Sequence, residues 1–150
     1  MHLVSALVLA VLAGPTHSSP TSDVSALFKD YGLFGTWAVD CNAEASPENP
    51  HVTVSEPEPG NVVERHDLGS RYATNAYRML DAHRVSATRI AVEVLLQPGT
   101  EAEQKQELVL SVSDHRRRTI FTQIEGGAVR VRNGVVVGYG VQTPRLTRCE

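Results

Sequence analysis

Apolar and polar residues alternate over most of the chain beyond residue 34, as they do in β-strands that bury one face. The alternation is clearest where Ile90, Val92, Val94 and Leu96 share one side of an extended segment. We expect strands at residues 35–41, 52–54, 62–66, 71–80, 85–96, 108–112, 118–124, 129–131, 135–139 and 145–149. The pattern therefore predicts a mainly β protein with about eight to ten short strands.

Turn residues separate these segments at intervals of about a dozen residues, which is typical of an antiparallel meander. Asn133-Gly134 is the strongest hairpin signal, because both central positions of a type I′ turn require positive φ. A meander of this length either closes into a small barrel or folds into a two-layer sandwich.

One short helix is expected before the strands. Between residues 24 and 31, apolar residues recur at steps of three and four, and Gly32 can end the helix. A second helix at residues 74–84 is the alternative to part of the strand pattern, since the apolar residues there also fit one helix face: Ala76, Met79, Leu80 and His83.

The amino terminus has the pattern of an export signal. Residues 3–13 are apolar, and Val11-Leu12-Ala13 suits a signal peptidase, so residues 1–13 are expected to be removed, with cleavage as late as about residue 19. The run is too short for a transmembrane anchor, which needs roughly 20 apolar residues, and the alternative is a buried helix of the fold. Residues 20–150 would then form one exported domain, periplasmic or secreted.

The chain has two cysteines, Cys41 and Cys149, which are 108 positions apart. An oxidising compartment outside the cell membrane favours a disulfide between them. Because a disulfide needs Cα atoms within about 7 Å, the first predicted strand must then lie beside the last. Closing a sheet produces this neighbourhood, so we expect an antiparallel barrel rather than a sandwich.

Charge is distributed unevenly along the chain. Residues 19–68 carry nine acidic and two basic side chains, whereas residues 115–150 carry two and seven. With a net charge of −3 and an exported domain, nucleic acid is not an expected partner. Guanidinium groups suit oxyanions, so the arginines of the last third are candidates for binding an anion or a partner: Arg116, Arg117, Arg118, Arg130 and Arg132.

No motif indicates catalysis. The six histidines lie singly, without the spacing of a metal site, so neither a metal nor a cofactor is expected. No Gly-x-Ser-x-Gly sequence is present, and thiol chemistry is lost if both cysteines are bonded. Solvated polar faces account for the histidines.

Gly35-Thr36-Trp37, on a first strand that follows a short helix, resembles the opening of the lipocalin and avidin group of ligand-holding barrels. In that group the tryptophan closes one end of the barrel, and a basic side chain from near the last strand packs over it. The resemblance therefore implies a barrel-closing cluster in this chain, with these members: Phe34, Gly35, Trp37 and Arg145 or Arg148.

Residues 34–41, with the sequence Phe-Gly-Thr-Trp-Ala-Val-Asp-Cys, and the final Cys149-Glu150 resemble a group of small, uncharacterised exported bacterial proteins. This second resemblance implies an exported protein with a disulfide, and no activity comes with it.

The expected function is that of an exported, non-catalytic binding module. A small apolar or anionic ligand would need a cavity in the barrel, with inward residues Val92, Val94, Leu108, Leu110, Val137 and Tyr139. The alternative is a protein or envelope partner, bound by the basic strand face or by the loop at residues 42–50. A further alternative, a small carboxylate-dependent hydrolase or isomerase, needs a cleft with an acidic residue of raised pKa.

Overall fold

Ten strands and one helix form the regular structure of residues 23–150, the part of the chain that the computed structural model describes. They are α1 Val24–Asp30, β1 Gly35–Ala38, β2 His51–Glu58, β3 Asn61–Asp67, β4 Asn75–Ser86, β5 Arg89–Leu96, β6 Gln104–Ser113, β7 Arg116–Ile124, β8 Val129–Arg132, β9 Val135–Val136 and β10 Leu146–Arg148. The predicted mainly β fold with one short helix is confirmed. The signal peptide predicted at residues 1–13 lies outside the described residues.

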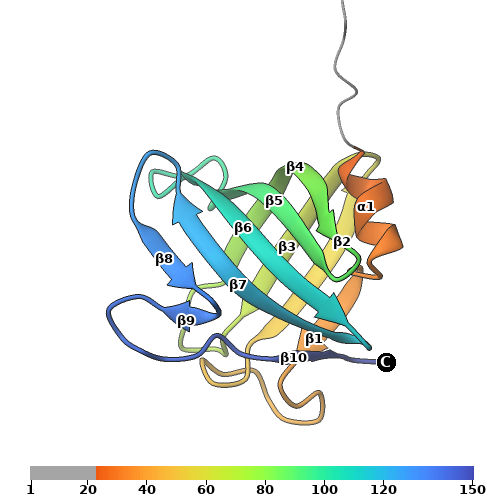
Figure 1. Cartoon of the computed structure of the whole chain (residues 1–150). Helices are drawn as coiled ribbons and strands as arrows, with labels where there is room; N and C mark the ends of the chain where they lie inside the picture. Colours follow the sequence, from red (N-terminus) through yellow and green to blue (C-terminus); the bar gives the residue numbers. More distant parts are fainter. Residues whose placement is uncertain (1–22) are drawn as a thin grey trace, which may run out of the picture.

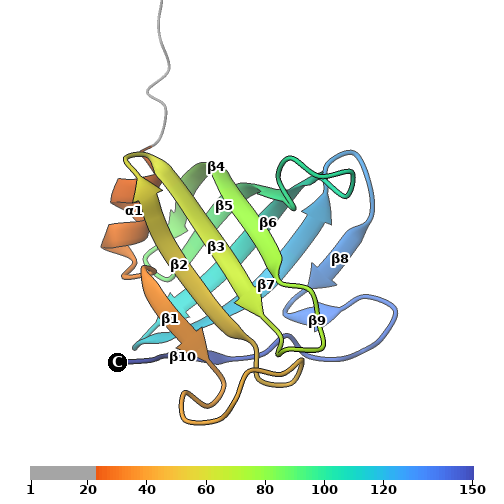
Figure 2. The ribbon, with the colours of Figure 1, turned by 180° about the vertical axis from the view of Figure 1, so that it is seen from behind.

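Eight of the strands close into an antiparallel barrel (Figures 1 and 2). Strands β1 to β7 follow one another as a meander, and β10 pairs with both β1 and β7. In the register, Trp37 of β1 lies opposite Arg148, and Leu146 lies opposite Arg117 of β7. Strands β8 and β9 form a hairpin on the remaining length of the same β7 edge. The predicted barrel is therefore confirmed.

The side chains on the inner face of the barrel form one continuous apolar core. On β5, the alternation read from the sequence places Ile90, Val92 and Val94 inside, where they are at most 1% exposed. Valines from β2 and Leu110 from β6 meet them.

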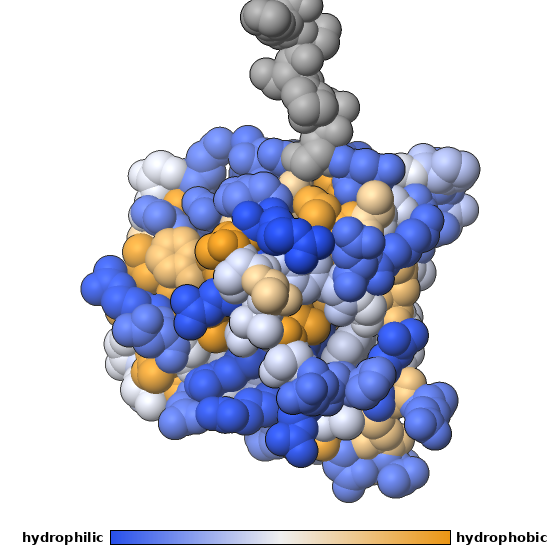
Figure 3. All heavy atoms as spheres, turned by 45° about the vertical axis from the view of Figure 1, so that its right-hand side comes forward, coloured by the Kyte–Doolittle hydropathy of each residue, from blue (hydrophilic) through white to orange (hydrophobic). Residues whose placement is uncertain are grey.

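Figure 3 shows the side of the molecule that carries α1, where hydrophilic residues separate several apolar areas of the surface.

Helix α1 packs against β3 and β4 at one end of the barrel. Asp23 caps its first turn, and the helix ends as predicted at Gly32, whose φ is 63°. The Leu33 N–H then donates to the Phe28 carbonyl at 2.8 Å, which is the bond of a Schellman motif. Phe28 and Leu33 are fully buried, so the helix and its C-terminal turn fill this end of the barrel.

Strand β4 differs from the sequence expectation. It continues to Ser86, so the two central strands meet at a turn around residue 87 and not at residues 81–84. Register shifts between Met79 and Asp81 and again near its end break the strict alternation, which is why the pattern misplaced the boundary. The helical alternative for residues 74–84 is wrong.

The strand predicted at residues 135–139 is also shorter than expected. Strand β9 ends at Val136, because Gly138 and Gly140 adopt positive φ and turn the chain back on itself. Val137 and Tyr139, which we expected to face the barrel interior, are 50% and 83% exposed. That part of the predicted inner face is therefore wrong.

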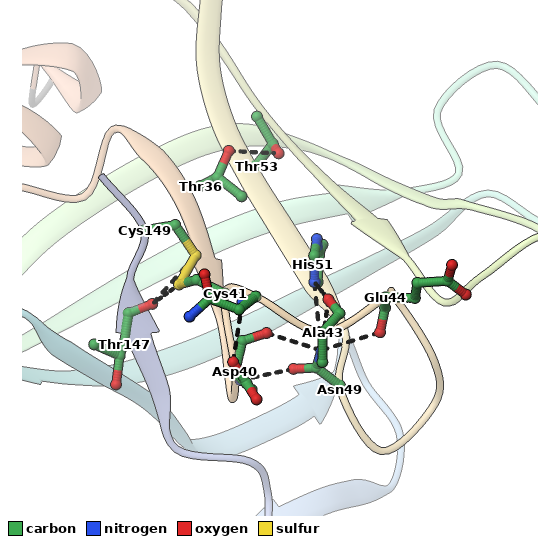
Figure 4. Close-up of a disulfide and its surroundings, with 11 residues drawn as sticks. Thr36, Asp40, Cys41, Ala43, Glu44, Asn49, His51, Thr53, Thr147 and Cys149 are labelled. Atoms are coloured by element: carbon green, nitrogen blue, oxygen red, sulfur yellow. Dashed lines mark hydrogen bonds between the residues drawn. A yellow bond between two sulfur atoms is a disulfide. The ribbon is translucent and has the colours of Figure 1, made fainter.

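The predicted disulfide joins the segment after β1 to the last residues of the chain. Cys41 and Cys149 have Cα atoms 5.5 Å apart, and the Cys149 N–H donates to the Thr36 carbonyl at 2.8 Å (Figure 4). The bridge therefore ties the two strands that complete the barrel.

We predict that replacing Cys41→Ala and Cys149→Ala together lowers the free energy of unfolding by several kcal/mol, because the chain-entropy estimate for a loop of about 100 residues is about 4.7 kcal/mol. Urea denaturation of the oxidised protein and of the double variant measures the difference. Equal midpoints and slopes would contradict the stabilising role of the bridge.

Candidate functional site

Trp37 lies at the helix end of the barrel, as the barrel-closing prediction requires. Its side chain is 1% exposed, and its indole N–H donates to the Leu33 carbonyl at 2.9 Å. Phe34 packs against the same core, with its ring centroid 6.1 Å from that of Phe28. The short turn after α1 therefore fixes the indole through a backbone acceptor.

The two arginines predicted to cover Trp37 lie in different places. Arg148 extends along the backbone at Gly35, where an added Cβ would be 3.6 Å from its Nε, and it lines a pocket together with Trp37. Arg145 lines a separate pocket on the outside of β6 and β7. The guanidinium above the Trp37 ring belongs to Arg117 of β7, with its Cζ 5.8 Å from the ring centroid. The closing role of Arg148 stays a prediction.

A charged pair lies inside the barrel. On β3, alternation places Glu64 on the inner face between Val62 and His66. On β7, alternation turns Arg117 inward. Arg117 Nη2 donates to Glu64 Oε1 at 3.1 Å, and Nη1 lies 2.9 Å from Oε2. The two side chains are only 3% and 4% exposed, so water scarcely screens their attraction.

His66 and Tyr77 extend this pair towards the other end of the barrel. His66 Nε2 lies 2.6 Å from Glu64 Oε1, and the His66 and Tyr77 rings are 4.8 Å apart. Burial alone would raise the pKa of Glu64, but Arg117 and His66 together lower it to about 2. Burial, and then the Glu64 charge, raises the pKa of Tyr77 to about 12. The cluster therefore keeps Glu64 ionised and Tyr77 neutral.

The geometry of the pair decides what it contributes. Among the described residues, Glu64 Oε2 and Arg117 Nη1 have no well-aligned hydrogen bond, although they are ion-paired. A buried ion pair with incomplete hydrogen bonding is often no more stable than well-packed apolar residues. Loss of one partner, however, leaves an uncompensated charge in the core.

We predict that Glu64→Gln lowers the free energy of unfolding by about 3–5 kcal/mol, because it leaves the Arg117 charge buried without a counter-charge. The double variant Glu64→Met with Arg117→Met should be more stable than the single variant. Chemical denaturation of all three proteins measures this. As a control, Lys105→Gln removes two ion pairs at the surface, with Glu93 and Glu125, and should change the midpoint much less than Glu64→Gln does. A single variant as stable as the parent would contradict the coupling.

The outer face of β6 and β7 carries a basic pocket, which is the second candidate site. Alternation on β7 separates the three consecutive arginines, since Arg116 and Arg118 point outward while the one between them points inward. They lie opposite Ser113 and Ser111 of β6, and Arg145 joins them from the segment before β10. The open pocket has a volume of about 290 Å³. Asp114, Arg117 and Ile120 complete the lining. We call the pocket formed by Ser111, Ser113, Arg116, Arg118 and Arg145 the arginine pocket.

Arg118 is fixed in the arginine pocket by the neighbouring hairpin. Its Nε donates to Thr143 Oγ1 at 3.0 Å, and its Nη2 donates to the Gly134 carbonyl. A Cβ at Gly134 would lie 2.6 Å from the Arg118 Cζ, and its φ is 72°, so glycine is required there. The predicted Asn133-Gly134 turn therefore shapes this pocket as well as the hairpin.

The outward arginines of this region have no acidic partners. None of Arg116, Arg130, Arg132 and Arg145 forms an ion pair with a described residue, in contrast to Lys105 and to the inward arginine. The sequence contains no acidic residue from 126 to 149 and none before 23. Arg130 and Arg132 point outward from β8, beyond the arginine pocket. This face therefore presents several guanidinium groups without ion-pair partners among the described residues, with Asp114 as the acidic residue that lines the same pocket.

The loop at residues 42–50, the other predicted contact surface, is held by Asn49 (Figure 4). Its Oδ1 accepts from the Asp40 N–H at 2.9 Å, and its Nδ2 donates to the carbonyls of Asp40, Ala43 and Glu44. His51 Nε2 lies 3.0 Å from the Ala43 carbonyl. One amide side chain thus organises the loop beside the disulfide, and the exposed Glu44 and Glu48 give this loop negative charge, in contrast to the basic face of β6 and β7.

Glu64 and Tyr77 were not among the residues singled out from the sequence, nor were Ser111 and Ser113. The expectation that solvated polar faces account for the histidines is wrong for His66, which shares the inner face of β3 with Glu64 and lies 2.6 Å from its carboxylate. A signal for Glu64 existed, because it occupies a core position in the alternation of its strand. Within residues 23–150, no three histidine, cysteine or acidic side chains come together as a metal site would require. No described helix is long and apolar enough to cross a membrane.

The class that fold and geometry define is a closed eight-stranded antiparallel β-barrel with one disulfide and two charged clusters, one inside and one outside. Comparison of the chain with models of known families, with curated proteins and with solved structures finds no match.

Proposed function

We propose that this protein is an exported, non-catalytic binding module that recognises an oxyanion group, a phosphate or a carboxylate of a small molecule or envelope component, in the arginine pocket. One observation carries the proposal. Three guanidinium groups, from Arg116, Arg118 and Arg145, line one pocket, and no described acidic residue pairs with any of them.

The side chains that line the arginine pocket are suited to an oxyanion ligand. Guanidinium groups form charge-assisted hydrogen bonds to phosphate and carboxylate, often in pairs. Ser111 and Ser113 can donate further hydrogen bonds from β6. The volume of about 290 Å³ is about ten times that of one water molecule in the liquid, roughly 30 Å³. Asp114 also lines the pocket, so an anion must seat on the arginine side.

The filled interior of the barrel favours a binding site on its outer surface. Val92, Val94 and Leu110 are all at most 2% exposed, so side chains fill the space around them. A filled core is the default for a barrel of eight strands. The charges inside are already used by Glu64 and its partners.

The remaining alternative, a carboxylate-dependent enzyme, has weaker support. It needs an acidic residue with a raised pKa in a cleft. The shifts at Glu56 and Glu64 both lower the pKa of the carboxyl group. For Glu56 the main cause is the hydrogen bond from the Gly60 N–H.

Support for export comes from the disulfide, which persists in oxidising compartments. The expected compartment is therefore the periplasm or the extracellular medium. Recovery of the oxidised protein from an envelope fraction would test that part of the proposal.

Isothermal titration with inorganic pyrophosphate at low ionic strength tests the binding site. We predict that Arg116→Gln with Arg145→Gln weakens binding at least tenfold, because each lost guanidinium removes charge-assisted hydrogen bonds. The control Arg71→Gln with Arg78→Gln removes two exposed positive charges elsewhere on the barrel and should change affinity little. Equal weakening by both pairs, or no binding by the parent protein, would contradict the arginine pocket as the site.

A further inference from the structure

The turn that follows β9 exposes a cluster of apolar side chains. Val137, Tyr139 and Val141 are 50%, 83% and 61% exposed. The other large apolar residues with exposed side chains lie singly along the described chain, as is normal for a soluble surface. Three such residues within five positions are therefore unusual, and we call them the apolar tip.

The apolar tip is an ordered part of the structure. The Val136 N–H donates to the Val141 carbonyl at 2.7 Å, and the Gly140 N–H donates back to the Val136 carbonyl at 3.0 Å. Val135 pairs with Gln142 below this turn. In Figures 1 and 2 the same segment projects away from the barrel beside β9. The hydrogen bonds therefore hold the apolar side chains out in solvent instead of allowing them to pack inward.

Two exposed arginines lie on β8, the hairpin strand next to the apolar tip. The Val137 N–H donates to the Arg130 carbonyl at 2.9 Å, so the tip continues directly from the hairpin that carries Arg130 and Arg132. Neither arginine has an ion-pair partner among the described residues, and residues 126–149 include no acid. The surface combines exposed aliphatic groups, one tyrosine and unpaired guanidinium groups.

We propose that the apolar tip, with Arg130 and Arg132, docks on the surface of an anionic phospholipid bilayer. Tyrosine suits the headgroup level of a membrane, because its ring is apolar and its hydroxyl is polar. Basic side chains beside an apolar insertion add attraction to anionic lipids. Val137 and Val141, on either side of Tyr139, supply the apolar side chains that enter the boundary between lipid headgroups and acyl chains.

The shape of the tip favours a bilayer over a protein partner. The tip is a projecting turn with three apolar side chains, whereas a stable protein interface takes about 20–30 residues from each side. In a symmetric pair of two copies, the arginines beside the two tips would face one another and repel. The docking does not depend on the arginine pocket, which lies on β6 and β7.

The variant Tyr139→Trp provides a local test in the full chain. The sole native tryptophan, Trp37, is buried and gives a constant background. We predict a blue shift of tryptophan emission when vesicles of phosphatidylglycerol and phosphatidylcholine are added at low salt, and little shift with phosphatidylcholine alone. Arg130→Gln with Arg132→Gln should weaken vesicle binding on the order of tenfold or more, since each basic group near an anionic surface contributes attraction.

Two controls keep the outcome decisive. Tyr72→Trp places the probe at another exposed tyrosine and should show no shift. Val137→Ser with Val141→Ser, added to Tyr139→Trp, should remove the shift while pyrophosphate binding stays unchanged. No shift with anionic vesicles, or an equal shift at position 72, would overturn the proposal. A blue shift caused by polyglutamate in place of vesicles would also overturn it, because it would indicate an acidic protein as the partner. A blue shift that depends only on protein concentration would overturn it as well, because it would indicate that the tip binds a second copy of this chain.

Discussion

The pairing of β10 with both β1 and β7 is the constraint on which the rest of the structure depends. This short strand converts a meander into a closed barrel, and the disulfide holds the residues just beyond it against the end of β1. Because β10 covers only the first part of the β7 edge, the remaining length is free to pair with β8. Closure therefore also decides where the hairpin with the apolar tip is attached.

Strand β7 contributes arginines both to the interior of the barrel and to the arginine pocket on its outer face. Successive side chains of a strand point to opposite faces, so three consecutive arginines cannot act together. Arg117 enters the core, where Glu64 compensates its charge, while Arg116 and Arg118 remain outside without acidic partners. The same residue type thus contributes to core electrostatics in one position and, in the next, to the surface for which we propose anion binding. Alternation along β7 links the two positions: when Arg117 is buried with Glu64, Arg116 and Arg118 necessarily point outward.

Much of the fold could be predicted from the sequence, because alternation, turn residues and a single cysteine pair are local or unambiguous signals. The inward residues of β5 and the turn at Asn133-Gly134 are examples. The charged clusters inside and outside the barrel were harder to predict from the sequence. The partner of Glu64 is 53 positions away and becomes its neighbour only after closure. Whether Arg117 points inward depends on where β7 begins, which no pattern in a run of three identical residues can show.

Irregular segments limited the prediction further. Arg145 lies before a three-residue strand, so its position depends on how the preceding loop crosses the outside of the barrel. The exposure of Tyr139 follows from two glycines with positive φ that end β9 early, although the apolar pattern alone continues through them. Such residues are placed by tertiary contacts and backbone geometry, and alternation carries no information about them.

The proposed site requires that the outward arginines of one barrel face bind an oxyanion while the inward arginine does not. Side-chain Nε–Hε resonances of arginine, followed by NMR during titration with pyrophosphate, test it residue by residue. We predict shifts for Arg116, Arg118 and Arg145, with Arg117, whose guanidinium is paired with Glu64, and Arg78 unmoved. Shifts spread evenly over all exposed arginines, or none at the arginine pocket, would contradict it.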